Sequence, residues 1–219
     1  MEQALAEYLS PTRTKPRLTE ALRTLAMVRY ATVKQLQSIE KPFRDFIFTK
    51  PSLQQLVDLG FIKINGAAGM VGTKGWELLK EADVPHIDHY QKRCRGKAKN
   101  HDLYLTEYLL RQITHEQTHF KFHTVFYPHF KGLRPDACIV CTRPTGYKIE
   151  FIECEYSDKP EDYFDDKKRR YGELGKDYNT YALWWKTWCN RLKLPFCSVE
   201  QFSFTVKCLN HDSRTSIFA

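Results

Sequence analysis

The N-terminal third of the chain carries three apolar patterns with helical spacing and one pattern of a short hairpin. Apolar side chains three and four positions apart indicate one face of an amphipathic helix, whereas short β-rich runs on both sides of a glycine-rich turn indicate paired strands. Thr32 and Ser52 are candidate N-caps, and Gly60 stands where a helix often ends. The predicted order is helix 19–29, helix 33–39, helix 53–59, hairpin 61–72 and a closing helix capped by Thr73.

This order of elements predicts a winged helix-turn-helix, in which the third helix enters the major groove and the hairpin is the wing. A tail pattern typical of such domains, LGFI, a wing and then Thr73, Gly75 and Leu78–Leu79, supports the prediction. The alternative is a helical protein–protein interaction module. The candidate DNA contacts of this domain are Lys50, Ser52, Gln54 and Gln55 on the third helix and Lys63 on the wing.

The remainder of the chain mixes helix and strand patterns. The predicted elements are helix 101–113, strand 120–127, a hairpin within 134–157, a charged helix 160–175, an aromatic helical segment 181–188 and strand 198–206. This succession indicates a central sheet covered by helices. The predicted fold class is therefore α+β, with a winged helix domain at 1–90, a basic linker at 91–100 and a second domain at 101–219.

Composition and charge narrow the class of protein. The hydrophobic content of 42% and the charged content of 27% are those of an ordinary globular protein. Neither a membrane span nor a signal peptide is visible, so we predict a cytoplasmic protein without a membrane partner. Seven scattered cysteines, an odd number, predict reduced thiols, several of them in the core, and leave a structural zinc site as the minor alternative.

The net charge of +8 points to a polyanionic partner, and nucleic acid is the most common one. The positive charge concentrates in the run KRCRGKAK at 92–99. Its cations are expected to contact phosphates, which position a protein on DNA without reading the sequence. These residues are Lys92, Arg93, Arg95, Lys97 and Lys99.

The hairpin within 134–157 carries acids where a half-buried hairpin rarely keeps them. A turn at 143–146 sets Thr142 opposite Tyr147, and the same count sets Asp136 opposite Glu153. Alternation along the strand then places Glu155 on the face of Glu153. Because opposed carboxylates repel, a cation between them is expected, and Mg²⁺ prefers a few carboxylates together with waters and phosphate oxygens.

This arrangement predicts metal-dependent phosphodiester chemistry, with Asp136 and Glu153 as the ligands of Mg²⁺ or Mn²⁺. Restriction-type nucleases combine a Pro-Asp with a Glu-x-Lys on the neighbouring strand, and here Glu155 stands in place of the lysine. Lys167 shares a helix face with Phe164 and Tyr171, so it is expected to point toward the carboxylates and to replace the missing lysine. The predicted catalytic set is Asp136, Glu153, Glu155 and Lys167; Glu107 is interpreted as an exposed helix residue.

Taken together, these segments resemble the replication-relaxation family of plasmids and mobile elements, which joins a winged helix to a PD-(D/E)xK nuclease-like domain. The resemblance covers roughly residues 18–175. It rests on ALRTLAMVRYATVKQLQ, the LGFI wing region, His101-Asp102-Leu103, Arg134-Pro135-Asp136-Ala137, Phe151-Ile152-Glu153-Cys154-Glu155 and Lys167 with Tyr171. The family implies a PD-(D/E)xK restriction-endonuclease-like fold and DNA binding in replication or transfer of mobile elements.

The predicted function is a DNA-binding protein of a mobile element, acting as a Mg²⁺-dependent endonuclease in replication, mobilisation or transposition. The alternative is a non-catalytic accessory or regulator that recruits a relaxase, helicase or transposase; a further option is an end-cleaving endonuclease that works with a partner transposase. Double-stranded DNA is the expected partner in each case, and homodimer formation stays open. Family members of this kind often carry an acid in place of the motif lysine, which makes cleavage the property to test.

Overall fold

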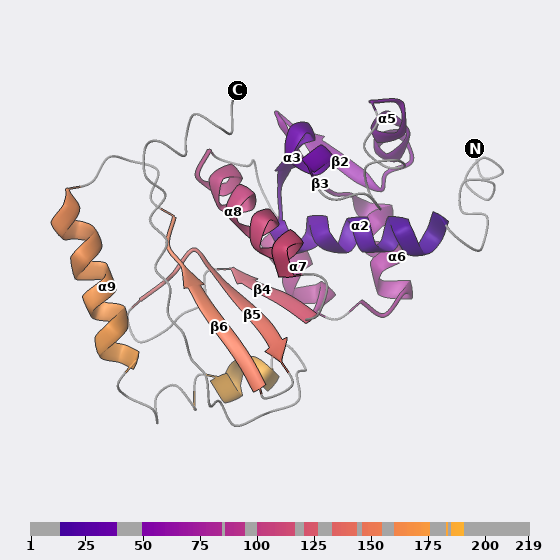
Figure 1. Ribbon diagram of the computed structural model, residues 1–219. Coiled ribbons are helices and arrows are strands. Elements are labelled where there is room, and N and C mark those ends of the chain that lie inside the picture. Colours follow the sequence, from indigo (N-terminus) through magenta and orange to yellow (C-terminus); the bar gives the residue numbers. More distant parts are fainter. Residues whose placement is uncertain are drawn as a thin grey trace. The chain divides into compact units, whose positions relative to one another are not determined.

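The structure is a computed structural model, and it describes residues 14–38, 50–84, 86–94, 100–116, 121–126, 133–143, 146–154, 160–175, 183 and 185–190. Within these residues the fold is mixed α+β, with helices and two small antiparallel sheets of three strands each (Figure 1). The chain divides into two compact units, residues 1–106 and 107–219. In the described part, no helix is long and apolar enough to cross a membrane. The predicted α+β class is confirmed.

The first unit combines helices with a sheet of strand order β1-β3-β2, in which β3 pairs antiparallel with both neighbours. Its elements are α2 (Thr14–Val28), β1 (Ala31–Thr32), α3 (Val33–Ser38), α5 (Lys50–Asp58), β2 (Ile62–Asn65), β3 (Ala68–Val71), α6 (Thr73–Glu81), α7 (Ile87–Arg93) and the first turns of α8 (Asn100–Glu116). The predicted helices and hairpin are present. The pattern did not predict β1, because two residues carry no periodic signal.

Thr32 and Gln35 cap the start of α3 reciprocally. The Thr32 hydroxyl accepts a hydrogen bond from the Gln35 backbone N–H at 3.1 Å, and the Gln35 side-chain oxygen accepts one from the Thr32 N–H at 2.9 Å. This capping box satisfies two backbone donors that a helix start would otherwise leave without partners. The predicted cap at Thr32 is therefore confirmed. The Gln35 side chain also donates to the Leu103 carbonyl at 2.8 Å, which ties α3 to the beginning of α8.

Two glycines allow the hairpin to return close to the chain before it. Gly60 ends α5 with φ of 78°, a conformation that glycine adopts without a steric penalty. A Cβ on Gly72 would lie 2.3 Å from the Gly60 carbonyl oxygen, so only glycine fits there. Gly72 is also the N-cap of α6 and makes no side-chain bond, while Thr73 is the first helical residue. The predicted cap at Thr73 is wrong, because this close approach requires glycine at the cap position.

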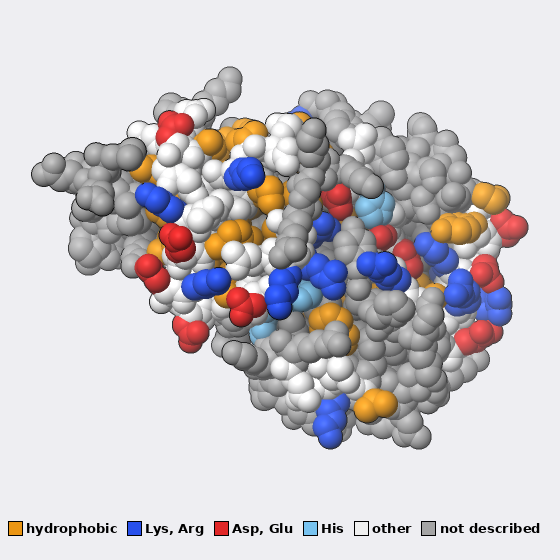
Figure 2. Space-filling view, turned by 180° about the vertical axis from the view of Figure 1, so that it is seen from behind, with side chains coloured by type: hydrophobic (Ala, Val, Ile, Leu, Met, Phe, Trp, Pro, Cys, Tyr) orange, Lys and Arg blue, Asp and Glu red, His pale blue; other side chains and the backbone are white. Residues whose placement is uncertain are grey.

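Figure 2 shows both Lys and Arg and Asp and Glu side chains of the described residues on the face that it draws, with several Lys and Arg side chains close together near the middle of the view. Several charged side chains of the described residues form pairs within one helix. Examples are Arg23 with Glu20 on α2, and Lys168 with Asp165 on the second-unit helix that covers 161–175. Such exposed pairs contribute little to stability. In these pairs, an acid on the same helix compensates the positive charge of a described Lys or Arg.

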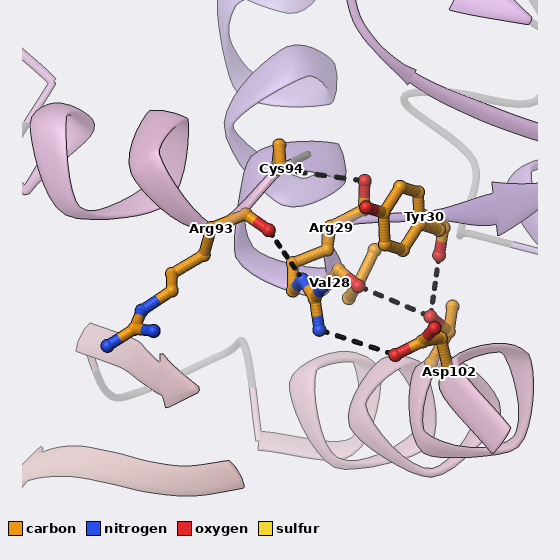
Figure 3. Close-up of polar contacts among 7 residues, drawn as sticks. Val28, Arg29, Tyr30, Arg93, Cys94 and Asp102 are labelled. Atoms are coloured by element: carbon orange, nitrogen blue, oxygen red, sulfur yellow. Dashed lines mark hydrogen bonds and ion pairs between the residues drawn. The ribbon is translucent and has the colours of Figure 1, made fainter. Parts of the chain in front are cut away.

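A buried ion pair joins the end of α2 to the beginning of α8 within the first unit (Figure 3). The Arg29 guanidinium lies 3.3 Å from the Asp102 carboxylate, and the two side chains are only 9% and 10% exposed. Arg29 also donates from Nε to the carbonyl of Arg93 at 3.0 Å, and the Cys94 thiol lies next to the Arg29 carbonyl at 3.8 Å. Burial raises the pKa of Cys94 to about 12, so this thiol stays protonated and unreactive.

The predicted linker 91–100 is helical at both ends, because 91–93 complete α7 and Asn100 begins α8; residues 95–99 lie outside the described residues. The division between the units falls inside α8 rather than at its start. Contacts explain this position. The Thr106 hydroxyl lies 3.2 Å from the carbonyl oxygen of Val28 and 2.5 Å from that of Tyr30, so the first turns of α8 belong to the first unit.

The second unit contains the rest of α8, an antiparallel sheet of order β4-β5-β6 and helix α9. Its elements are β4 (Lys121–Phe126), β5 (Ala137–Arg143), β6 (Gly146–Ile152) and α9 (Glu161–Gly175), followed by helical residues 185–190. Trp185 and Trp188 are buried, which confirms that these two belong to the core. Trp184 and the predicted strand 198–206 lie outside the described residues.

Helices α8 and α9 contact opposite faces of this sheet. Glu150 and Phe151 are neighbours on β6, so their side chains point to opposite faces. The Tyr108 hydroxyl of α8 donates to Glu150 at 2.6 Å, while Phe151 stacks on Tyr171 of α9 with ring centroids 6.0 Å apart. The face that carries Phe151 continues to Glu153 just beyond the strand. The side chains of α9 are thereby brought to the end of the hairpin.

Candidate functional site

The hairpin has the register that the sequence predicted. Thr142 pairs with Tyr147, and the same register continues to the ends of both strands. One step beyond the ladder the count places Asp136 opposite Glu153, and the Asp136 N–H donates to the Ile152 carbonyl at 2.9 Å. The predicted juxtaposition of the two acids is confirmed. They meet at the open end of the hairpin, because both strands finish there.

Both carboxylates are held by defined donors. The Asp136 Oδ2 atom accepts a hydrogen bond from the Cys154 N–H at 2.8 Å, which closes the end of the hairpin. The Glu153 Oε1 atom accepts one from the Tyr171 hydroxyl at 2.6 Å, and its Oε2 atom accepts one from the Lys167 ammonium at 3.2 Å. Glu153 is therefore bonded to α9 through both oxygens, and its side chain is 10% exposed.

Burial raises the pKa of Glu153 above its ordinary value. The hydrogen bond from Tyr171 and the charge of Lys167 act in the opposite direction, whereas the charge of Asp136 raises the pKa further. The upward direction shows that the donors compensate for only part of the desolvation. The contribution of Asp136 also indicates that the carboxylates of Asp136 and Glu153 are close enough to interact electrostatically. A second cation at this place would lower the energy of the charged pair.

Lys167 stays charged in this setting. Burial disfavours its ammonium, but the interactions with Tyr163 and Glu153 outweigh burial, and the pKa of Lys167 is raised. Its Nζ atom lies 5.0 Å from the centroid of the Tyr163 ring, within the range of a cation–π interaction. The side chain is 21% exposed, so it remains less desolvated than Glu153. The predicted orientation of Lys167 toward the carboxylates is confirmed.

The Asp136 and Glu153 side chains offer the ligands that Mg²⁺ takes from proteins, which are one or two carboxylates with the other positions left to water and phosphate oxygens. The charge of Asp136 contributes to the raised pKa of Glu153, and a cation near both carboxylates would counteract this contribution. No cluster of three metal-ligating His, Cys, Asp or Glu side chains occurs among the described residues. Glu155, the third predicted acid, lies outside them. Among the described residues, Asp136 and Glu153 are the two that would hold a metal at this site.

The cysteines give no second metal site in the described part of the chain. Cys138 and Cys141 are an odd number of positions apart on β5, so their side chains lie on opposite faces of the sheet. The prediction of reduced core cysteines is confirmed for the residues that the structure describes. These are Cys94, Cys138, Cys141, Cys154 and Cys189, all buried and free.

The candidate DNA contacts of the first unit lie on α5 and β2. Gln54 and Gln55 are exposed on α5, and Lys63 is exposed on β2. Gln54 donates to Asp58 at 2.8 Å, so an acid shares the exposed face of this helix. Lys50 and Ser52 lie in the first turn of α5, although their side chains lie outside the description.

The structure describes two of the candidate phosphate contacts in the basic run 92–99. Lys92 and Arg93 lie in the last turn of α7, where Lys92 is exposed and Arg93 is half-buried. Their positive charge suits the negative end of that helix. Arg95, Lys97 and Lys99 lie outside the described residues.

Sequence reasoning missed two contacts of the second unit. It treated Tyr171 as a packing residue, whereas its hydroxyl is also a donor to Glu153; the signal was the four-residue spacing from Lys167, which places both polar groups on one helix face. It did not single out Glu150, whose buried carboxylate is bonded by Tyr108 across 42 residues of sequence. Glu107, interpreted as exposed, is half-buried and paired with Arg111 at 3.1 Å.

Comparison of the chain with models of protein families, with curated proteins and with solved structures gave no match.

The pKa of Glu153 predicts how the second unit responds to pH. Because the folded state raises this pKa above 4.5, it holds the Glu153 proton more tightly than the unfolded chain does. The contribution of Glu153 to stability is therefore largest at low pH and is lost as pH rises from about 4.5 through the folded pKa. In Glu153→Gln this contribution is absent. We expect the free energy of unfolding of Glu153→Gln, relative to wild type, to rise across that interval in urea titrations between pH 4 and 8; a difference independent of pH would contradict the raised pKa.

Proposed function

We propose that the protein binds double-stranded DNA through its first unit and cleaves it with a Mg²⁺-dependent, PD-(D/E)xK-like site in its second unit. The observation that carries the proposal is the meeting of Asp136, Glu153 and Lys167 at the open end of one hairpin. Two acids and a lysine are the residue types that metal-dependent phosphodiester cleavage needs. The lysine comes from α9 instead of the strand, and Glu155 holds its usual place in the sequence.

The first unit supports the DNA-binding part of the proposal by its order of elements. Helix α2, the short strand β1, helices α3 and α5 and the β2–β3 hairpin follow one another, and β1 joins the hairpin in a sheet of order β1-β3-β2. A winged helix-turn-helix has this succession. In that fold α5 is the recognition helix, and the hairpin with Lys63 is the wing. Mobile-element replication, mobilisation or transposition is the setting that the family resemblance implies.

The residues of the second unit divide the work of cleavage. Asp136 and Glu153 would hold Mg²⁺, which supplies a Lewis acid for the phosphoryl oxygen and an activated water. Tyr171 fixes the orientation of Glu153 through its 2.6 Å hydrogen bond, and burial raises the pKa of Tyr171, so that it stays a donor. Lys167 provides a positive charge that would stabilise the charge developing on the phosphate. Glu153 and Tyr171 are buried, whereas Asp136 is half-buried.

The second candidate is a non-catalytic DNA-binding accessory that recruits a relaxase, helicase or transposase. One observation favours it: the Lys167 ammonium already compensates the Glu153 charge without a metal. In that case the hairpin is a retained nuclease-like scaffold. The same surface of the first unit would bind DNA, and metal-dependent cleavage would be absent.

The experiment that separates the two candidates is cleavage of supercoiled, linear and branched DNA with Mg²⁺ or Mn²⁺, and with a chelator as control. The endonuclease proposal expects metal-dependent products from the wild type and none from Glu153→Ala. Tight, salt-dependent binding by both proteins without any cleavage would establish the accessory.

Duplex binding by the wild type should weaken steeply with salt, because released counterions drive protein–DNA association. If Lys63 contacts a phosphate from the wing, Lys63→Ala should lower the slope of log K against log[salt] by about 1. The matched control is Lys168→Ala, which removes an exposed lysine paired with Asp165 on α9. Fluorescence anisotropy with a labelled duplex at several salt concentrations measures both slopes. A slope for Lys63→Ala equal to that of Lys168→Ala would remove the wing from the interface.

A further inference from the structure

The ammonium group of Lys167 already forms an ion pair with Glu153, one of the two carboxylates that would bind a metal. The Lys167 Nζ atom lies 3.2 Å from Glu153 Oε2, and Tyr171 bonds the other oxygen at 2.6 Å. A tyrosine hydroxyl can stay in place beside a coordinated carboxylate, because it donates to an oxygen that has further lone pairs. An ammonium at the same carboxylate is different, because its charge repels an incoming divalent cation.

We propose that Lys167 and a divalent cation compete for Glu153, so that Lys167 closes the metal site of the free protein and opens it by moving to a phosphate of bound DNA. The inference rests on the metal site of the proposed function and adds to it an order of events. In the free protein the ion pair compensates Glu153. With DNA present, the Lys167 ammonium pairs with a phosphate instead, and the Glu153 carboxylate becomes available to bind the metal.

The surroundings of Lys167 fit such a movement. Its flexible four-carbon stem allows the ammonium to shift between anions, which the planar fork of arginine does less readily. The side chain is twice as exposed as that of Glu153, 21% against 10%, so the ammonium can move toward solvent while the carboxylate stays. The Tyr163 ring, 5.0 Å from Nζ, offers a second contact that does not depend on Glu153. Tyr171 meanwhile keeps Glu153 in place.

The neighbouring lysine on α9 provides a matched control. Lys168 is exposed and pairs with Asp165 at 3.5 Å, away from the Glu153 carboxylate that Lys167 bonds. Substitution of either lysine by methionine removes one positive charge from the same helix and keeps a long unbranched side chain. A general effect of net charge on cation binding would therefore be alike in both variants. Competition for Glu153 predicts an effect in one of them only.

The test is the binding of Mn²⁺ alone to the full chain, followed by electron paramagnetic resonance of the free ion. Lys167→Met should bind Mn²⁺ at least about tenfold more tightly than wild type, a change of about 1.4 kcal/mol, while Lys168→Met should match wild type. Lys167→Arg keeps the charge and should stay close to wild type. Glu153→Gln introduced into Lys167→Met should abolish the gain. Circular dichroism checks folding, and Lys167→Gln takes the place of Lys167→Met if the latter does not fold.

Equal Mn²⁺ affinity in wild type and Lys167→Met, including no binding by either, would overturn the competition. So would a gain in Lys168→Met or Lys167→Arg as large as that in Lys167→Met. These results are separable from the fate of the proposed function. Wild-type cleavage with an unchanged Mn²⁺ affinity in Lys167→Met leaves the endonuclease and removes the competition. A tenfold gain without any cleavage leaves the competition and removes the endonuclease.

Discussion

Alanine at Asp136 or Glu153 should abolish metal-dependent DNA cleavage and leave duplex binding largely intact. The two acids stand opposite each other at the end of the hairpin, and each would supply a ligand to the metal. Electrostatic stabilisation of the reacting phosphate is usually the largest single contribution to such catalysis, so the loss in rate should exceed about 100-fold. Duplex binding should persist because the candidate contacts Gln54, Gln55 and Lys63 lie in the other unit.

Two milder substitutions separate chemistry from folding. Asp136→Asn keeps an acceptor for the Cys154 N–H, and Glu153→Gln keeps an acceptor for Tyr171, while both remove the charge that a metal needs. The control is Glu173→Gln on α9, which removes an exposed acid that pairs with Arg169 at 3.0 Å. This variant should cleave DNA like wild type. Gel assays with Mg²⁺ and Mn²⁺ measure the rates, and anisotropy measures binding. Cleavage by Glu153→Gln at the wild-type rate would rule out the proposed metal site.

The candidate site could be predicted from the sequence where local periodicity determines geometry. Alternation along a strand and the position of one turn are sufficient to place Asp136 opposite Glu153, because a hairpin register is fixed by its turn. Helical spacing likewise predicted the orientation of Lys167. Lys167 and Tyr171 are four residues apart, so their side chains share one face of the helix. Both are properties of a few neighbouring residues. They hold in the folded protein because they follow from local chain geometry, and not from contacts between distant segments.

Structural features that depend on contacts between distant segments could not be predicted from the sequence. The pairing of Arg29 with Asp102 spans 73 positions, and no periodicity joins the two residues. Strand β1 is also invisible, because its two residues are held by pairing with β3 and not by their own propensity. At the start of α6 the N-cap is Gly72 and not Thr73, although threonine is a good capping residue. The backbone of Gly60 leaves no room for a Cβ at position 72. Tertiary proximity decided each case.

Asp102→Leu should destabilise the first unit by about 3–5 kcal/mol, because it deletes the carboxylate that compensates a buried guanidinium. The cost arises from the Arg29 charge that stays in a poorly solvated place, more than from the loss of attraction itself. Replacing both partners in Arg29→Met/Asp102→Leu removes the charge as well. That double variant should recover at least about half of the lost stability, since apolar pairs often replace buried ion pairs without a large penalty.

Amide hydrogen exchange of peptides from the first unit measures these free energies without interference from the second. The matched control is Glu20→Gln, which breaks the exposed pair of Glu20 with Arg23 on α2 and should cost less than about 1 kcal/mol. The contrast between the two pairs isolates burial, because both join an arginine to a carboxylate at 3.3 Å. If the double variant were as unstable as Asp102→Leu alone, the cost would lie in the packing around Asp102. The ion pair would then be a consequence of the junction between α2 and α8, and not the interaction that stabilises it.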